Sequence, residues 1–426
     1  MRKLLPTALA ILGAAVLASC GEQQPSDVFA PSLDKDTKCS IKVVGDYSNF
    51  EALETEFDRF NEYYPNVSLT YEKLDDYKNT LGTVLSGNSK PNIFFSYTWM
   101  NGDAKYAPVL SHMEELSDAS LKLKLDCIRP GLISRDASGK VYMVPVFSRT
   151  YGTMVNNDLF KKEGLAIPTT WDELLNVSKT FAERGYKNPM MGFSKSSSSC
   201  LMNTVAYPMF VAELAKDPAA LKLANDLDPA AGKYMRGALE AVDQLVKKKV
   251  VDLTECDKIS DNYNQVILRF FEGDVPMMIA QGDTVSGTKK RESQSAAFKE
   301  SPFEYSFHPI PVTAQGGYFI DSPSVEFSVN KDCENLDMTN EFMRFLIRNT
   351  ELNEMATAKR LVTPTKAMSF DPVYAPFGKV AAERTFSPEV LGVKDTLSTQ
   401  IRNASFKVGK GQITIEDAIA NYGNIK

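Results

Sequence analysis

The feature that most constrains the fold is an alternation of strand-like and helix-like segments between residues 40 and 97. Residues 40–47, 67–72 and 91–97 are short segments that are either apolar or alternate in polarity, which is typical of strands. The segment after the first of them carries apolar side chains at helical spacing, until Pro65 ends the pattern: Phe50, Leu53, Phe57, Phe60 and Tyr64. A second helix is expected over 75–85. Strand, helix and strand in this order predict an α/β fold with parallel strands and crossover helices.

The loops after these strands are the first places to look for a ligand site. In open α/β sheets, ligands bind beyond the carboxyl ends of the strands, where loops converge. The loop after the first expected strand contains Asp46 and Tyr47, and the loop after the third contains Tyr97 and Trp99. A loop tryptophan either packs over a core or offers a flat face to a ring-shaped ligand, and the sequence leaves both readings open. We take all four residues as candidate ligand contacts.

The stretch "GKVYMVPVFSRTYGTMVNNDLF", residues 139–160, places polar and aromatic side chains between two strand-like segments. Phe147, Arg149 and Tyr151 are unusual for a core, but they suit the floor of a cleft where the chain crosses from one domain to another. The alternative is a surface turn, with Arg149 solvated and Tyr151 packed. Arg149 and Tyr151 are therefore candidate ligand contacts.

Two later segments give clear local expectations. Thr170 and Glu173 have the spacing of a capping box, and the helix that follows should bury Trp171 in a core. Further on, a helix that Gly273 ends and a strand over 275–280 lead to a loop with Gln281 and Asp283. Such side chains can hold the hydroxyl groups of a polyol, or they can simply make a turn.

The N-terminus indicates export. Residues 1–19 have a basic start, a short apolar run and a small-residue end, which together are typical of a signal peptide. The sequence "LASCG" resembles a bacterial lipobox, which would make Cys20 a lipid anchor. Residues 20–38 are mostly polar and contain two prolines, so we expect a flexible tether.

Composition excludes several classes of function. A net charge of −6 and a pI near 5.3 argue against a nucleic-acid partner. Besides Cys20 there are five widely spaced cysteines without a CxxC pair, so no metal site is expected: Cys39, Cys127, Cys200, Cys256 and Cys333. His112 and His308 are the two histidines, and no G-x-S-x-G motif accompanies them. We therefore expect a protein that is not an enzyme and carries no cofactor.

Several motifs in order resemble the sugar-binding family of extracellular solute-binding proteins of ABC importers, the maltose-binding-protein-like group. They are "GKVYMVPV", "GTMVNNDLFKKEGL", "PTTWDELL", "FFEGDVPMMIAQG", "FHPIPV" and "LVTPTKA". This chain departs from the family pattern in three places. Asp283 and Thr284 stand where an aromatic residue is usual, Arg360 stands where a small residue is common, and residues 320–324 replace a glycine pair. These changes make the expected pocket more polar.

The resemblance implies a two-lobed periplasmic-binding-protein fold of the class II type, with the ligand in a cleft between α/β lobes joined by hinge segments. Lobe one would comprise 39–146 and 311–361, and lobe two 147–310 and 362–426. Closure of the lobes around the ligand would present the protein to the permease. Late in the chain, close to where it would pass between the lobes, Tyr318, Asp321 and Arg360 become candidate ligand contacts. The full set of candidate ligand contacts is Asp46, Tyr47, Tyr97, Trp99, Arg149, Tyr151, Gln281, Asp283, Tyr318, Asp321 and Arg360.

The resemblance implies a lipid-anchored, extracytoplasmic monomer that delivers a mono- or oligosaccharide to an ABC importer, attached to the membrane only through its anchor. Arg149 and Arg360 make an acidic or amidated sugar an option, since a guanidinium can hold a carboxylate. A polyamine or another small organic ion is the alternative, because carboxylates and aromatic residues can surround an amine. A glycan-active enzyme is a more distant alternative.

Overall fold

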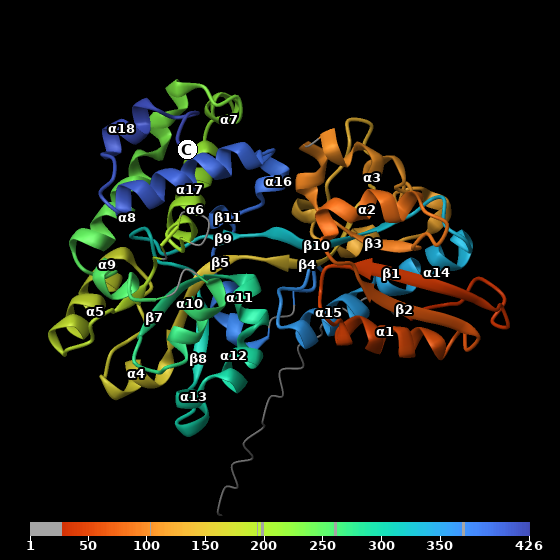
Figure 1. The fold of residues 1–426 in the computed structure, drawn as a ribbon, viewed down its shortest axis with the longest axis horizontal. Coiled ribbons are helices and arrows are strands. Elements are labelled where there is room, and N and C mark those ends of the chain that lie inside the picture. The colour runs from red at the N-terminus through yellow and green to blue at the C-terminus, as the bar shows by residue number, and fades with distance from the viewer. Residues whose placement is uncertain (1–27, 103, 194, 197–199, 260–261, 369–370) are drawn as a thin grey trace, which may run out of the picture. The chain divides into compact units, whose positions relative to one another are not determined.

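The fold contains two main β-sheets, each with helices packed against it (Figure 1). The computed structural model describes residues 28–426, apart from 103, 194, 197–199, 260–261 and 369–370. Residues 31–426 group into one compact unit. The expected signal peptide, Cys20 and the start of the expected tether lie outside the described residues. Within the described part, no helix combines the length and the apolar character that crossing a membrane requires.

The first sheet has the strand order β2-β1-β3-β10-β4. Its strands are β1 (Cys39–Gly45), β2 (Val67–Lys73), β3 (Ile93–Ser96), β4 (Val144–Arg149) and β10 (Ser322–Val329). β1 runs parallel to both β2 and β3, which confirms the parallel arrangement expected from the sequence. β10 returns much later in the chain and pairs antiparallel with β3 and β4, so the complete sheet is mixed.

The second sheet has the order β6-β7-β5-β8. Its strands are β5 (Tyr151–Asn156), β6 (Met190–Met191), β7 (Met277–Gln281) and β8 (Tyr305–His308), and a separate parallel pair joins β9 (Phe319–Ile320) to β11 (Thr385–Phe386). β5 is antiparallel to β7 and β8. We call the first sheet and its helices the first lobe, and the second sheet and its helices the second lobe. The predicted two-lobed α/β fold is confirmed.

Helices connect the strands and cover the sheets. The α-helices are α1 (Glu51–Asn61), α2 (Tyr77–Ser86), α3 (Ala107–Ser111), α4 (Asn157–Lys162), α5 (Trp171–Glu183), α6 (Asn203–Leu214), α7 (Pro218–Asn225), α8 (Arg236–Lys247), α9 (Leu253–Cys256), α10 (Tyr263–Phe270), α11 (Gly282–Ser286), α12 (Thr288–Gln294), α13 (Ala296–Glu300), α14 (Leu336–Leu346), α15 (Asn349–Lys359), α16 (Pro388–Leu391), α17 (Asp395–Gly409) and α18 (Ile415–Ala420). A 3-10 helix over Thr98–Gly102 follows β3, and another over Pro130–Leu132 precedes β4.

The first-lobe helix α1 forms because its apolar residues recur every three or four positions. Leu53, Phe57 and Phe60 are all buried, as the spacing predicts. The Phe60 ring lies 5.1 Å from that of Phe342 on α14, in an edge-to-face arrangement. The aromatic faces of α1 and α14 therefore pack together and help to build the first core.

In the second lobe, α6 is the central helix. It is buried on nearly every side, and α8 and α17 both pack against it (Figure 1). At α5 the predicted capping box is present, since the Thr170 hydroxyl accepts a hydrogen bond from the Glu173 backbone and the Glu173 carboxylate accepts one from the Thr170 backbone. The core position expected for Trp171 is wrong in part. Trp171 packs against the core but stays half-buried, because it is the first residue of the helix.

Three segments cross between the lobes. β4 leads into β5 with only Thr150 between them, so the first strand continues further than the sequence suggested (Figure 1). The end of β4 is a regular strand. Its residue Phe147 is buried, and the Phe147 ring lies 5.8 Å from that of Phe50. Asp321 separates β9 from β10 in the same way. The third crossing follows α15, where the Ser148 N–H donates to the Val362 carbonyl at 2.9 Å.

The end of the expected tether is held on the first lobe. The Ser32 backbone N–H and side-chain hydroxyl donate to the two oxygens of Glu341 at 2.8 and 2.7 Å. The Tyr64 hydroxyl donates to Glu341 at 2.6 Å. Residue 32 therefore marks a point at which the chain is already fixed to α14.

Gly152 on β5 lies where a side chain has no room. A Cβ there would lie 2.5 Å from the His308 carbonyl oxygen and 2.7 Å from the Phe307 ring, both on β8. We expect Gly152→Ala to lower the free energy of unfolding by about 1–3 kcal/mol, the usual cost of overpacking. Urea denaturation measures this change. The control is Gly237→Ala on α8, where the Cβ meets nothing within 4 Å and where alanine favours the helix. Equal stability of both variants would contradict the prediction.

Candidate functional site

A pocket of about 710 Å³ opens between elements of the two lobes. This is within the range of roughly 300–1,000 Å³ that small-molecule sites occupy. On the first-lobe side it is lined by Lys78, Thr98, Trp99, Asn101 and Ser134, and on the second-lobe side by Tyr207, Pro388, Glu389, Gly392, Val393, Lys394, Asp395, Thr396 and Ser398. The first group includes the loop after β3, which is where the strand rule predicted a ligand site. The second group was not predicted.

Trp99 is held as a platform in this pocket. Its ring stacks on that of Tyr97 at 5.2 Å, with 14° between the planes, and the edge of Tyr106 supports it at 5.0 Å. The Tyr97 hydroxyl in turn donates to Asp46 at 3.0 Å. Burial and the Asp46 carboxylate raise the pKa of Tyr97 far above its ordinary value, so this donor keeps its proton. The structure thus brings together Asp46, Tyr97 and Trp99 from two loops.

Lys78 gives the platform a positive neighbour. Its ammonium lies 5.1 Å from the centroid of the Trp99 ring, which is cation–π distance, and the side chain lines the pocket. Lys78 sits on α2, outside the loops that the strand rule selects. Sequence reasoning had no signal for it.

On the opposite side, Tyr151 supports a second aromatic wall. Tyr151 begins β5, and its ring lies 5.6 Å from that of Tyr207 on α6. Tyr207 is almost fully buried and lines the pocket. Tyr207 was missed because α6 reads as a buried helix, and nothing in its pattern distinguishes a core tyrosine from one at a pocket wall.

Glu389 on α16 supplies a carboxyl group to the pocket. Burial raises its pKa to about 7, while the nearby Arg149 guanidinium acts in the opposite direction. The Ser387 hydroxyl lies 3.3 Å from one of its oxygens. Arg149, at the end of β4, is thus placed close enough to influence a pocket residue, while its contact with a ligand stays a prediction.

None of the other candidates lines this pocket among the described residues. Tyr47 packs against Phe95, with the Lys359 ammonium 4.5 Å from its ring centroid. Tyr318 packs on Phe386. Gln281 ends β7 in register with Tyr151, and the side chain of Asp283 lies outside the described residues.

Arg360 ends α15 in the left-handed conformation. Its guanidinium donates to Thr288 at 2.9 Å and to the Tyr305 hydroxyl at 3.0 Å, and it pairs with Asp371 at 3.4 Å. These contacts account for its position at the third crossing. A carboxylate on a ligand would have to compete with Asp371 for this cation.

Arg129 binds all three crossing segments at once. Two of its nitrogens donate to the two oxygens of Asp321 at 2.7 and 2.8 Å. The guanidinium also donates to the carbonyls of Thr363 and Thr365 at 2.7 and 2.8 Å and to the Ser148 hydroxyl at 3.0 Å. Both oxygens of Asp321 are therefore engaged in holding the crossings, which accounts for a position that the sequence assigned to ligand contact.

Removal of the Arg129 side chain should lower the stability of the folded protein. Arg129→Ala leaves the Asp321 carboxylate, which is 5% exposed, without its partner. We expect a loss of about 3–5 kcal/mol in the free energy of unfolding, as for other broken buried ion pairs. Urea denaturation measures it. Lys222→Ala, which removes an exposed ion pair with Asp226 on α7, is the matched control and should have no measurable effect. A change for Arg129→Ala as small as that of the control would contradict the prediction.

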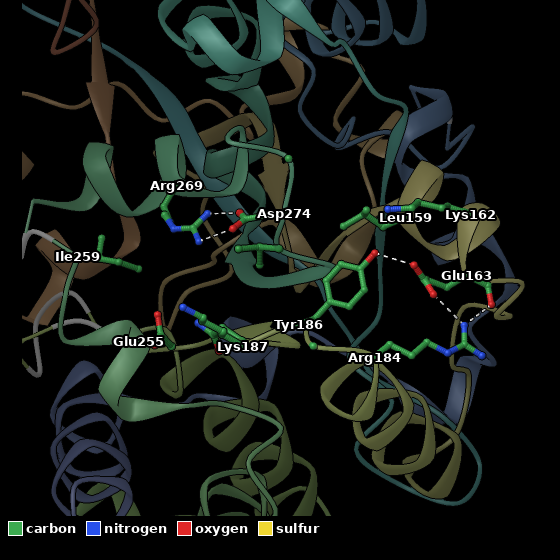
Figure 2. Close-up of a pocket in the computed structure, with 14 residues that line it drawn as sticks. Leu159, Lys162, Glu163, Arg184, Tyr186, Lys187, Glu255, Ile259, Arg269 and Asp274 are labelled. Atoms are coloured by element: carbon green, nitrogen blue, oxygen red, sulfur yellow. Dashed lines mark hydrogen bonds and ion pairs between the residues drawn. The ribbon is translucent and has the colours of Figure 1, made fainter.

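A second pocket, of about 560 Å³, lies within the second lobe, around α4 and the turn after α5 (Figure 2). Several of its charged groups pair with each other. Arg184 and Tyr186 both donate to Glu163, at 2.9 and 2.8 Å, and Arg269 pairs with Asp274 (Figure 2). These five side chains of the second pocket are therefore already engaged with one another.

In the described part of the chain, neither a cluster of metal ligands nor a histidine supplies catalytic groups to the pocket. Among the described residues, no group of three or more His, Cys, Asp or Glu is placed to hold a metal ion. His112 lies between Asp332 and Ser86, and His308 contacts Ser306. Neither histidine lines the pocket at Trp99.

A two-lobed α/β fold with a pocket lined from both lobes has the architecture of a ligand-binding protein. The family model for bacterial extracellular solute-binding proteins matches residues 45–351, and the chain belongs to this family. The family consists of binding proteins, which agrees with the expectation that the chain is not an enzyme.

Known proteins resemble the chain over most of its length. The melibiose/raffinose/stachyose-binding protein MelE of Bacillus subtilis (strain 168) is 22% identical over 309 residues, covering 71% of this chain and 67% of MelE. The apo form of RafE from Streptococcus pneumoniae superposes with a TM-score of 0.67 at 15% identity, covering 93% of this chain and 99% of RafE. A sugar transporter of Bacillus licheniformis in complex with stachyose gives 0.60 at 17% identity, covering 91% and 100%. At these identities the solved structures show the shared fold.

Proposed function

We propose that this protein captures a mono- or oligosaccharide in the pocket at Trp99 and delivers it to an ABC importer by closing its two lobes. The observation that carries the proposal is the Trp99 platform, held by Tyr97 and Tyr106 and facing a pocket that Tyr207 also lines. A fixed aromatic face binds the apolar side of a sugar ring at low entropic cost. MelE is a melibiose/raffinose/stachyose-binding protein and the Bacillus licheniformis transporter is in complex with stachyose, which supports a carbohydrate.

The charge of the pocket favours a neutral sugar. Lys78 and Lys394 line it together with the acids Glu389 and Asp395, so the pocket offers groups of both kinds rather than a surface of one charge. A polyamine would meet the Lys78 ammonium over the platform, and like charges repel. An acidic or amidated sugar would rely on Lys78 or Arg149, because Arg360 is engaged with Asp371.

We assign ligand contact to Trp99 first, with Asp46 and Tyr97 positioning it and with Arg149 and Tyr151 supporting the opposite wall. Contacts from Tyr47, Gln281, Asp283, Tyr318, Asp321 and Arg360 stay predictions. Lobe closure moves surfaces toward each other and can add contacts that one conformation lacks.

The ligand class can be tested by thermal shift. We expect at least one of raffinose, stachyose, a chitin oligosaccharide and a galacturonic acid oligomer to raise Tm, because a ligand that binds only the folded state stabilises it. Trp99→Ala should lose most of that rise. Trp171→Phe is the control and should keep it, since Trp171 packs on the second-lobe core away from the pocket. If spermidine raises Tm and no sugar does, the carbohydrate assignment is wrong.

We also propose that residues 1–19 are removed as a signal peptide, that Cys20 carries lipid, and that the protein is an extracytoplasmic monomer. Support comes from the "LASCG" sequence and from the match to an extracellular family. Replacement of Cys20 by alanine should move the protein from the membrane fraction to the soluble fraction of expressing bacteria, as an immunoblot would show. Replacement of Cys39, which lies on β1, is the control and should leave it with the membrane. An unchanged distribution for Cys20→Ala would contradict the anchor.

A further inference from the structure

Glu326 is the most unusual polar residue among those described. It lies on β10, between β3 and β4 in the first sheet, and is 1% exposed, yet neither carboxyl oxygen has a hydrogen-bond partner. Burial raises its pKa well above the ordinary value. An isolated buried carboxylate is very costly, so Glu326 must be a neutral acid.

The position of Glu326 connects it to the pocket. It pairs in register with Ser96 at the end of β3, two residues before Thr98, which lines the pocket next to Trp99. Phe327, the next residue on β10, points to the opposite face and stacks with Phe95. Glu326 therefore lies behind the pocket wall that carries the platform.

Glu389 is the second acid of this region, and it lines the pocket itself. It lies close enough to Glu326 for a negative charge on Glu389 to raise the pKa of Glu326. Its own pKa of about 7 means that the neutral form is well populated at neutral pH. Other charged or titratable groups act on it or share its pocket: Arg149 on β4, Asp321 before β10, Tyr207 on α6, Lys78 on α2, and Lys394 and Asp395 before and at the start of α17.

We propose that Glu389 contacts the ligand as a neutral carboxylic acid and donates its proton in a hydrogen bond to a ligand oxygen, with neutral Glu326 leaving the wall behind it uncharged. This inference rests on the proposed carbohydrate ligand. A neutral carboxyl group both donates and accepts, whereas a carboxylate only accepts. The ring and glycosidic oxygens of a sugar only accept, so they can pair with Glu389 only in its protonated form.

The proposal fixes the sign of the pH dependence. Binding that needs the protonated form is constant well below the pKa of Glu389 and weakens above it, by up to about tenfold per pH unit. A cationic solute gives the opposite trend, because ionised Glu389 would attract it. Glu56 also has a raised pKa, of about 8, but it lies on α1 beside Arg59 and Glu351, and it does not line the pocket.

Calorimetric titration of the full chain between pH 5.5 and 8.5 tests this, with raffinose, stachyose, a chitin oligosaccharide and a galacturonic acid oligomer as probes. We expect the sugars that bind to do so at least about tenfold more weakly at pH 8.5 than at pH 5.5. Glu389→Gln keeps a donor and an acceptor but cannot ionise, so its affinity should no longer change with pH. Glu383→Gln, on an exposed nearby segment, is the matched control and should keep the pH profile of the unmodified protein.

The outcomes separate the two proposals. Sugar affinity that is independent of pH, or that increases with pH, overturns the role of Glu389 and leaves the carbohydrate function intact. A pH profile that survives in Glu389→Gln also overturns it. Absence of binding by all four sugars at every pH removes the proposed function and this inference with it. If Glu389→Gln does not fold, as circular dichroism would show, the profile of the unmodified protein compared with Glu383→Gln decides.

Discussion

The guanidinium group of Arg129 is the interaction on which the two-lobed arrangement depends. Three segments pass between the sheets, and Arg129 donates hydrogen bonds to each of them, through Ser148, Asp321 and the carbonyls of Thr363 and Thr365. The planar guanidinium has five N–H donors in a fixed geometry, so one side chain can satisfy acceptors from several strands. These hydrogen bonds fix the three crossing segments relative to one another. They act on the crossing segments and not on the sheets at either side.

The pocket depends on that arrangement, because its two walls come from segments that are separate in the chain. Asp46 and Tyr97 hold Trp99 on one wall, while Tyr151 and Tyr207 stand on the other. The platform is built by stacking and the far wall by a buried helix, so packing within the protein holds both of them in place. Rigid walls reduce the entropy that binding would otherwise cost. Glu389 adds a carboxyl group that can donate a hydrogen bond only while it is protonated, and Glu326 lies behind the pocket wall.

Local patterns predicted a large part of this protein. The capping box at Thr170, the parallel pairing of the first three strands and the cluster of Asp46, Tyr97 and Trp99 all follow from short segments of sequence. Glu389 and Tyr207 did not follow from any pattern. A glutamate at the start of a four-residue helix and a tyrosine on a buried helix look like ordinary structural residues until the fold brings them to one pocket.

Short-range sequence patterns predicted the α/β character, the first three strands, helices α1, α2 and α5, and the loop that carries the platform, because periodicity and capping act over a few residues. Only the tertiary structure decided the partners of the charged groups. Asp321 binds Arg129, 192 positions earlier in the chain, and Arg360 is held by Thr288, Tyr305 and Asp371. Whether a buried charge holds the fold or faces a ligand depends on which opposite charge the chain brings within about 3 Å, and no local pattern encodes that distance.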